Sequence, residues 1–141
     1  MVPVHADDYV IQPPGAADGG LDGLTLPAVF AAAVRDGGDA VALVDGARAR
    51  TWREWRAEVD ALARGLQEAG VEPGDVVALH LPNCWEYLTL HLAAASVGAV
   101  TLPVHRGNAP ADVRALLERV GPAVLALPPG GRDADGPLGT A

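Results

Sequence analysis

The spacing of apolar residues between residues 51 and 70 predicts an amphipathic helix. These residues recur at three- and four-residue steps, which places them on one helical face. Thr51 and Glu54 have the spacing of a capping box at the start of this helix, and Gly70 marks its end. We expect the apolar face to pack on a sheet rather than to form a ligand cage. The face consists of Trp52, Trp55, Val59, Leu62 and Leu66.

Three short, continuous apolar runs follow this helix, and they predict strands that are covered on both faces. The runs span residues 76–81, 99–104 and 123–127. Helical patterns at residues 84–97 and 109–120 separate them. Strands that alternate with helices at this spacing indicate a parallel sheet with right-handed crossovers. This part of the chain is therefore expected to form a βαβαβ unit.

The segment before the amphipathic helix predicts a helix and a hairpin. Thr25 is a candidate N-cap for a helix over about Leu26–Arg35, and two glycines stop that helix. Asp45-Gly46 then suits a tight reversal between the short runs AVALV and ARAR. The N-terminal part of the fold is thus a helix followed by a two-stranded hairpin.

These elements place the chain in the α/β class, as a small open parallel sheet with a βαβαβ core and an N-terminal helix plus hairpin. We expect this subdomain over residues 24–127, which suits the 141 residues of the chain. Pro/Gly-rich sequence predicts a flexible lead-in at residues 1–23 and a mobile tail at residues 128–141.

Composition narrows the classes of partner. The net charge of −8 argues against nucleic acid as a partner, because the chain has no basic stripe that could neutralise phosphates.

All 10 basic residues are arginine, so no mechanism can use a lysine of this chain. The single cysteine, Cys84, allows no internal disulfide and predicts a cytoplasmic location. The first ten residues lack the basic region of a secretory signal.

A membrane span is considered because the chain carries no formal charge from Tyr87 to Val104, about 18 residues and long enough for a spanning helix. Gly98 divides this stretch into a helix and a strand, and no basic cluster flanks it to set an orientation. We therefore expect a buried helix and strand, and no membrane contact.

Several kinds of reactive site are disfavoured by residue type and spacing. A metal site would need three or four converging ligands, but His80, Cys84 and His91 belong to different elements and no second cysteine exists. The start of a helix could lower the pKa of the Cys84 thiol, although a small, partly buried turn residue is the simpler interpretation. Ser96, the only serine, lies in an apolar helix without a Gly-x-Ser-x-Gly motif.

Asn83, His105 and Arg106 are the candidate contacts for a substrate or a partner. They follow the first and second parallel strands, and open α/β sheets bind ligands at the carboxyl ends of their strands. Arg106 has the geometry to hold a carboxylate or phosphate with two hydrogen bonds. The alternatives stay open: Asn83 as a turn or cap residue, and His105 and Arg106 as a solvated loop pair.

The stretch from Leu24 to Leu127 resembles the opening segment of the adenylate-forming, AMP-binding superfamily. Its members are acyl- and aryl-CoA synthetases, aryl-acid–AMP ligases, peptide-synthetase adenylation domains and luciferases. The resemblance rests on the order and spacing of the short motifs ALVDG, TWREW, GVEPGD, LPNCWEY and GAVTLP. The segments LPNCWEY and LPVHR are more similar to the acyl/aryl-CoA synthetase and aryl-acid ligase branches than to peptide-synthetase domains.

The resemblance also implies what is missing. The family binds ATP with a later Ser/Thr/Gly-rich loop ending in Pro-Lys-Gly, and it uses a downstream acidic residue and a C-terminal lysine. No catalytic, cofactor-binding or metal-binding residue of the family therefore carries over to this chain, and ATP and Mg are implied only for a completed enzyme. The positions that carry over are structural: Pro82-Asn83, Gly98-Ala99 and Pro103.

A small parallel sheet with an uncovered edge predicts self-association or a complementing ligase-like chain. The leading hypothesis is the N-terminal portion of an adenylate-forming acyl- or aryl-acid ligase, truncated or split and inactive alone. The alternative is a stand-alone, non-catalytic interaction or scaffold module derived from that fold. An inactive gene remnant and a small enzyme using His105 or Cys84 are weaker alternatives.

Overall fold

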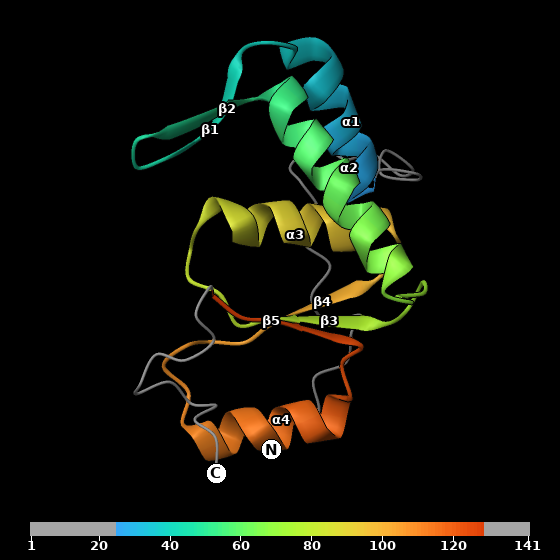
Figure 1. The fold of residues 1–141 in the computed structure, drawn as a ribbon, viewed down its shortest axis with the longest axis vertical. Helices are drawn as coiled ribbons and strands as arrows, with labels where there is room; N and C mark the ends of the chain where they lie inside the picture. Colours follow the sequence, from blue (N-terminus) through green and yellow to red (C-terminus); the bar gives the residue numbers. More distant parts are fainter. Residues whose placement is uncertain (1–24, 129–141) are drawn as a thin grey trace, which may run out of the picture.

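A computed structural model describes residues 25–128 of the chain. The predicted lead-in at 1–23 and residues 129–141 of the predicted tail lie outside this range. Within it, four helices and five strands follow one another in the predicted order (Figure 1). The α/β fold class is confirmed, with a small parallel sheet, an N-terminal helix and a hairpin.

The parallel sheet is built around its first strand. β3 (Val76–Leu79) lies between β4 (Val100–Pro103) and β5 (Val124–Ala126), and it pairs with both in parallel. At the centre of the register, Val77 lies opposite Thr101 on one side and Val124 on the other. The chain therefore moves from β3 to one neighbour and then crosses back to the other.

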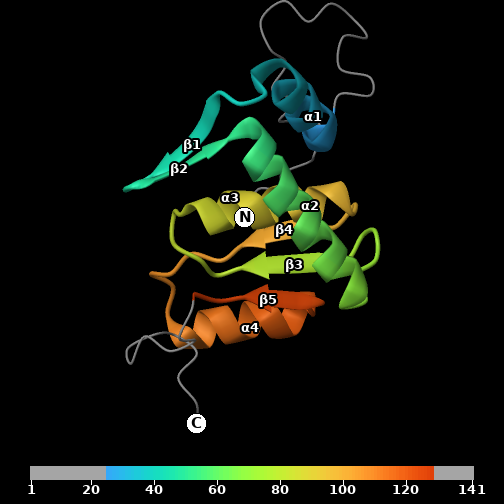
Figure 2. The ribbon, with the colours of Figure 1, turned by 45° about the horizontal axis from the view of Figure 1, so that its top comes forward.

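This strand order places the two connecting helices on opposite faces of the sheet. α3 (Trp85–Ser96) covers one face and α4 (Pro110–Val120) covers the other (Figures 1 and 2). Right-handed crossovers that leave in opposite directions produce this arrangement. Successive residues of β3 lie on opposite faces of the sheet. Val77 and Leu79 belong to the core between the sheet and α3, whereas Ala78 belongs to the core between the sheet and α4.

Two further helices form an outer layer on α3. α1 (Leu26–Gly37) and α2 (Trp52–Glu68) pack on each other and on α3, which separates them from the sheet (Figure 1). Phe30 of α1 meets the ring of Trp55 edge-on, with 5.1 Å between centroids. Trp55 also donates a hydrogen bond from Nε1 to Thr89 Oγ1 at 2.9 Å, which joins α2 to α3. The hydrogen bond satisfies the N–H group of the buried Trp55 indole.

The capping box predicted for the second helix is present. The Thr51 hydroxyl accepts a hydrogen bond from the Glu54 amide, and the Glu54 carboxylate accepts one from the Thr51 amide. The predicted packing of this helix was wrong in two respects. Its apolar face packs on α3 rather than directly on the sheet, and Leu62, at one edge of that face, is 40% exposed.

The hairpin consists of β1 (Val41–Asp45) and β2 (Arg48–Thr51), which pair antiparallel. Gly46 at its turn has a φ of 58°, a conformation that glycine adopts without strain. The hairpin projects beside α2 at the level of the outer helices (Figure 1). Ala42 and Leu43 of β1 pack against the main core, and side chains of the hairpin also reach the first turn of α3, as described below.

Element ends differ from the predictions by one or two residues, as expected where helices fray. The first helix continues to Gly37 instead of ending near Arg35, and α3 is one residue shorter at each end than predicted. None of the helices within residues 25–128 has both the length and the apolar content that a membrane span requires. The uncharged stretch divides at Gly98, whose φ is 77°, into α3 and β4.

Candidate functional site

The loops that leave β3 and β4 diverge at the carboxyl edge of the sheet (Figure 1). The chain turns from β3 towards α3 on one face and from β4 towards α4 on the other. Adjacent strands whose connections diverge in this way form a topological switch point, where open α/β sheets bind ligands. The two exits are tied together, because the Val104 amide donates to the Leu79 carbonyl at 2.9 Å.

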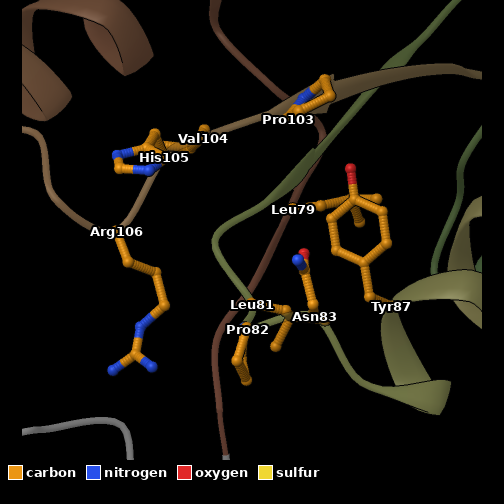
Figure 3. A pocket seen from close by; sticks show the side chains of 9 residues that line it. All are labelled: Leu79, Leu81, Pro82, Asn83, Tyr87, Pro103, Val104, His105 and Arg106. Carbon is orange, nitrogen blue, oxygen red and sulfur yellow. The ribbon is translucent and has the colours of Figure 1, made fainter.

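A pocket of about 370 Å³ lies at this switch point. Leu79, Pro103 and Val104 supply apolar surface from the strand ends. In Figure 3, Asn83 and Tyr87 lie on the α3 side, and His105 and Arg106 lie on the opposite side, on the segment that follows β4. Leu81 and Pro82 complete the lining.

The three candidate contacts, Asn83, His105 and Arg106, all line this one pocket. Asn83 lies more than twenty positions before the other two along the chain, and the parallel pairing of β3 with β4 brings them together. The structure thus places all three predicted residues at one site. Their contact with a substrate or partner remains a prediction.

The orientation of the His105 ring is fixed by its own loop. The Gly107 amide donates to His105 Nδ1 at 3.0 Å, and the Asn108 amide donates to the His105 carbonyl at 3.2 Å. A Cβ at Gly107 would lie 2.9 Å from the ring, so a glycine suits this close approach. Nδ1 is therefore an acceptor, and Nε2 is the nitrogen that carries the hydrogen in the neutral ring.

Tyr87 is the pocket residue that the sequence did not single out. It lies in the first turn of α3 and contributes an aromatic face and a hydroxyl (Figure 3). Its position in an apolar helix suggested only a core role. The sequence feature that could have identified Tyr87 is its place in the topology, because the first turn of a helix that follows a parallel strand lies beside the carboxyl end of that strand.

The first turn of α3 is anchored by the hairpin. Asp45 Oδ2 accepts a hydrogen bond from the Trp85 amide at 3.1 Å, across 40 positions of sequence. The Arg50 guanidinium lies 4.7 Å from the centroid of the Trp85 ring and also pairs with Glu58 at 2.7 Å. Because Tyr87 and Asn83 flank Trp85, these contacts also support one wall of the pocket.

The weaker alternative, in which the start of the helix lowers the pKa of the Cys84 thiol, is contradicted. Burial raises the pKa of the Cys84 thiol, and the neighbouring Glu86 carboxylate adds to this effect. Cys84 is the N-cap residue of α3 and makes no side-chain capping hydrogen bond. Its thiol therefore stays protonated near neutral pH, as the simpler interpretation of a partly buried turn residue implies.

Two further histidines of residues 25–128, His80 and His91, make structural contacts. His80 is buried, and its Nδ1 lies 3.2 Å from the Val104 carbonyl. His91 Nδ1 lies 2.9 Å from Thr101 Oγ1, which links α3 to β4. Among residues 25–128, no three His, Cys, Asp or Glu side chains gather as metal ligands.

The side chains that line this pocket are suited to binding rather than to phosphate transfer. The lining of the pocket contains no carboxylate that could hold Mg²⁺ and no glycine-rich turn that could cradle phosphates. The lining of this pocket thus does not fit an ATP–Mg site. The pocket combines an apolar floor with amide, phenol, imidazole and guanidinium groups, which suits a planar or anionic group.

Comparison with known proteins identifies the family. The family model for the AMP-binding enzyme matches residues 30–138. The chain belongs to this family. The resemblance seen in the sequence is thereby confirmed, over a match that covers most of the chain.

Curated relatives match the chain over part of their length. Protein Y of Streptomyces griseus is 72% identical over 138 residues, which are 98% of this chain and 45% of that protein. A salicylyl-CoA synthase / salicylate adenylyltransferase of Streptomyces is 42% identical over 74 residues, 50% of this chain and 13% of that protein. The chain thus spans less than half the length of these relatives.

Solved structures of adenylate-forming enzymes share the fold. The N-terminal subdomain of Klebsiella oxytoca NpsA, solved with anthranilyl-AMSN, is 30% identical with a TM-score of 0.67 over 72% of this chain and 26% of that one. A Mycobacterium tuberculosis fatty acyl CoA synthetase gives a TM-score of 0.69 at 26% identity over 72% of this chain and 20% of that one. This chain therefore corresponds to a fragment of an AMP-binding domain.

Proposed function

We propose that this chain is the N-terminal portion of an adenylate-forming ligase that activates an aryl or acyl carboxylic acid. In the complete reaction, the carboxylate oxygen attacks the α-phosphorus of ATP and pyrophosphate leaves. A thiol then attacks the carbonyl carbon of the acyl-adenylate, and AMP leaves as the thioester forms. The observation that carries the proposal is the family match over residues 30–138.

The preference for an aromatic acid is supported by the relatives. They include the salicylyl-CoA synthase / salicylate adenylyltransferase, a 2-hydroxy-7-methoxy-5-methyl-1-naphthoate–CoA ligase of Streptomyces carzinostaticus and the NpsA subdomain solved with anthranilyl-AMSN. These names describe those proteins. For this chain, salicylate and benzoate are the first acids to test.

The chain alone is proposed to be inactive and to act with a complementing ligase-like segment. Its sequence contains no lysine, and its described pocket lacks a phosphate cradle and a metal-binding carboxylate cluster. Phosphate transfer depends on positive groups that neutralise charge developing on the phosphates. The complementing segment must supply these groups and the Ser/Thr/Gly-rich loop, with ATP and Mg²⁺ bound there.

In this proposal, the pocket at the ends of β3 and β4 faces the complementing segment or its bound substrate. Asn83, His105 and Arg106 are the contact residues, with Arg106 placed to hold an anionic group. Their common location at the switch point supports this role.

The test is salicylate- and benzoate-dependent ATP–pyrophosphate exchange. The purified chain should give no exchange, and co-expression with a ligase-like polypeptide that carries the missing loop should restore it. Exchange by the chain alone would refute the need for a complement. Co-purification without exchange, across all ligase-like partners and both acids, would favour the scaffold alternative.

Within an active complex, Arg106→Ala should weaken exchange by about tenfold or more, which corresponds to the loss of about 1.4 kcal/mol of interaction with an anionic group. Arg114→Ala is the matched control, because Arg114 lies on α4 outside the pocket lining. Equal activity of the two variants would remove Arg106 from the contact role while leaving the family-level function intact.

A further inference from the structure

The two edge strands of the parallel sheet differ in what they offer to another strand. Within residues 25–128 the strand order is β4-β3-β5, so β4 and β5 each have one side without a neighbouring strand. On β4, the amides of Val100 and Val104 donate towards the β3 segment. Alternate residues of a strand direct their backbone groups to opposite edges, so Thr101 and Pro103 face outward. Pro103 has no N–H to donate, which weakens strand pairing at the β4 edge.

The β5 edge retains both a donor and an acceptor. The Ala126 carbonyl accepts a hydrogen bond from the His80 amide at 3.0 Å, which directs the backbone groups of Ala126 towards β3. By the same alternation, Leu125 directs its N–H and its C=O to the open edge. No side chain of residues 120–128 carries a formal charge, whereas charged side chains commonly protect edge strands from pairing. β5 is therefore the edge that is better suited to a further strand.

β5 also has apolar surface that another strand could bury. Val124, Leu125 and Ala126 are each only partly buried, in contrast to the fully buried residues of β3. Leu125 packs on the core between the sheet and α4, and Val124 and Ala126 pack on the core between the sheet and α3. A strand added beside β5 would therefore extend both cores.

A second copy of this chain fits the β5 edge. We propose that two chains pair antiparallel through β5, about a two-fold axis at Leu125, so that their three-stranded sheets become continuous. The two Leu125 residues then lie directly opposite and exchange both of their outward hydrogen bonds. A two-fold axis uses the same surface on both copies and closes the assembly at a dimer, and an antiparallel strand at the edge of a parallel sheet is common.

The charge of the chain is compatible with this pairing. Its net charge is −8, and like charges that lie directly opposite destabilise a strand pair. The uncharged β5 segment lets two copies meet without placing such charges opposite each other. The dimer goes beyond the proposed ligase function and does not rest on it.

Sedimentation of the full chain measures the pairing. The mass should rise with concentration from the 14.4 kDa of one chain to about twice that value. Leu125→Lys and Leu125→Glu should each raise the dissociation constant of the dimer by about tenfold, because each removes apolar surface and places like charges opposite one another. An equal mixture of the two variants should restore the dimer, because opposite charges then meet across the axis.

Val100→Lys is the matched control, because Val100 is a 55% exposed valine on the other edge strand. This variant should leave the dissociation constant unchanged, and thermal unfolding should show that all the variants fold. A chain that stays monomeric at every concentration would overturn the pairing. Failure of the mixture to restore the dimer, or an equal loss in Val100→Lys, would overturn it as well.

Hydrogen exchange tests the same pairing without any substitution. Exchange of the Leu125 amide should slow as the concentration of the chain rises, because that amide becomes hydrogen-bonded in the dimer, while exchange of the outward Thr101 amide on β4 stays the same. Protection of Thr101 instead of Leu125 would overturn the assignment to β5. The ligase function is measured separately by pyrophosphate exchange, so failure of the dimer leaves that function standing.

Discussion

The parallel sheet and the hairpin show two different ways of holding a strand in place. In β3, Val77, Ala78 and Leu79 are all 0% exposed, with helices packed on both faces. In the hairpin, Val44 is 66% exposed, and directional contacts from Asp45 and Arg50 to the first turn of α3 set its position. Apolar burial on both faces therefore fixes the sheet that supports the pocket, whereas the hairpin combines the partial burial of Ala42 and Leu43 with a few polar contacts.

This difference matters for the site. One wall of the pocket follows β4 and depends on the buried sheet, and the other wall follows the first turn of α3, which the hairpin anchors. Substitutions in the sheet should unfold the whole domain. Substitutions in the hairpin should loosen one wall and leave the rest folded.

The largest expected effect comes from the buried strand. Leu79→Ala should lower the free energy of unfolding by about 2–5 kcal/mol, because it leaves a cavity in a fully buried position. Val44→Ala in the hairpin should change it by less than about 0.5 kcal/mol, since that side chain is mostly exposed. Urea unfolding of both variants measures the difference. Similar losses would mean that the hairpin belongs to the same cooperative core.

Two glycines test the packing of the outer helices. A Cβ at Gly37 would overlap the Trp52 indole, so Gly37→Ala should lower the free energy of unfolding by about 1–3 kcal/mol. Gly65, inside α2, has open space around an added Cβ, so Gly65→Ala should raise it by about 0.5–1 kcal/mol. Thermal unfolding shows whether each substitution raises or lowers the stability. Destabilisation by both Gly37→Ala and Gly65→Ala would contradict the packing of α1 on α2.

Asp45→Ala should have a smaller and local effect. It removes the carboxylate that accepts a hydrogen bond from the Trp85 amide. By analogy with other helix caps, the free energy that holds this first turn should fall by about 0.5–2 kcal/mol. Hydrogen exchange should rise in the hairpin and in the first turn of α3, with β3 unchanged. Asp45→Asn retains an acceptor oxygen and serves as the control. Uniform acceleration across β3 would show that the hairpin is not an independent unit.

The smallest expected effect is a pH dependence at the start of α2. The hydrogen bonds from the Thr51 amide and hydroxyl hold the pKa of Glu54 below its ordinary value of 4.5. The ionised carboxylate therefore stabilises the fold above about pH 4.5, and this contribution is lost as pH falls through the lower pKa of the folded state.

Glu54→Gln should accordingly be less stable than the unsubstituted chain at pH 7, with the gap closing on acidification. Glu68→Gln, near the other end of α2, is the control, since Glu68 makes no ion pair or side-chain hydrogen bond with residues 25–128. Thermal melts from pH 7 to pH 3 compare them. A gap that widens at low pH would contradict the capping role.

Local sequence predicted most elements because their signals lie within a few residues. Thr51 and Glu54 mark a helix start by side chains three positions apart, and both hydrogen bonds are present. Leu62 shows where such signals fail, since helical spacing placed it on the apolar face while the packing of α2 against α3 leaves it at an exposed edge. The capping of α3 by Asp45 had no local signal at all.

The candidate site was predictable in part for the same reason. Asn83, His105 and Arg106 follow apolar runs that end within a residue or two, so their place at strand ends could be inferred. These three residues line one pocket because β3 and β4 are neighbouring strands. The presence of Tyr87 in the same lining depends on the direction in which α3 leaves the sheet. Neither relation is contained in any single segment.

By itself, the sequence determined the kinds of element, their approximate ends, the absence of lysine and the membership of the AMP-binding family. Apolar periodicity, caps and glycine turns act over a few residues, so these features need no tertiary information. Only the tertiary structure decided the strand order β4-β3-β5, the separation of α2 from the sheet and the pocket between the two loops. These features depend on which apolar surfaces, far apart in the sequence, pack against one another. Because the hydrophobic effect is non-directional, it does not select those surfaces until the whole core packs.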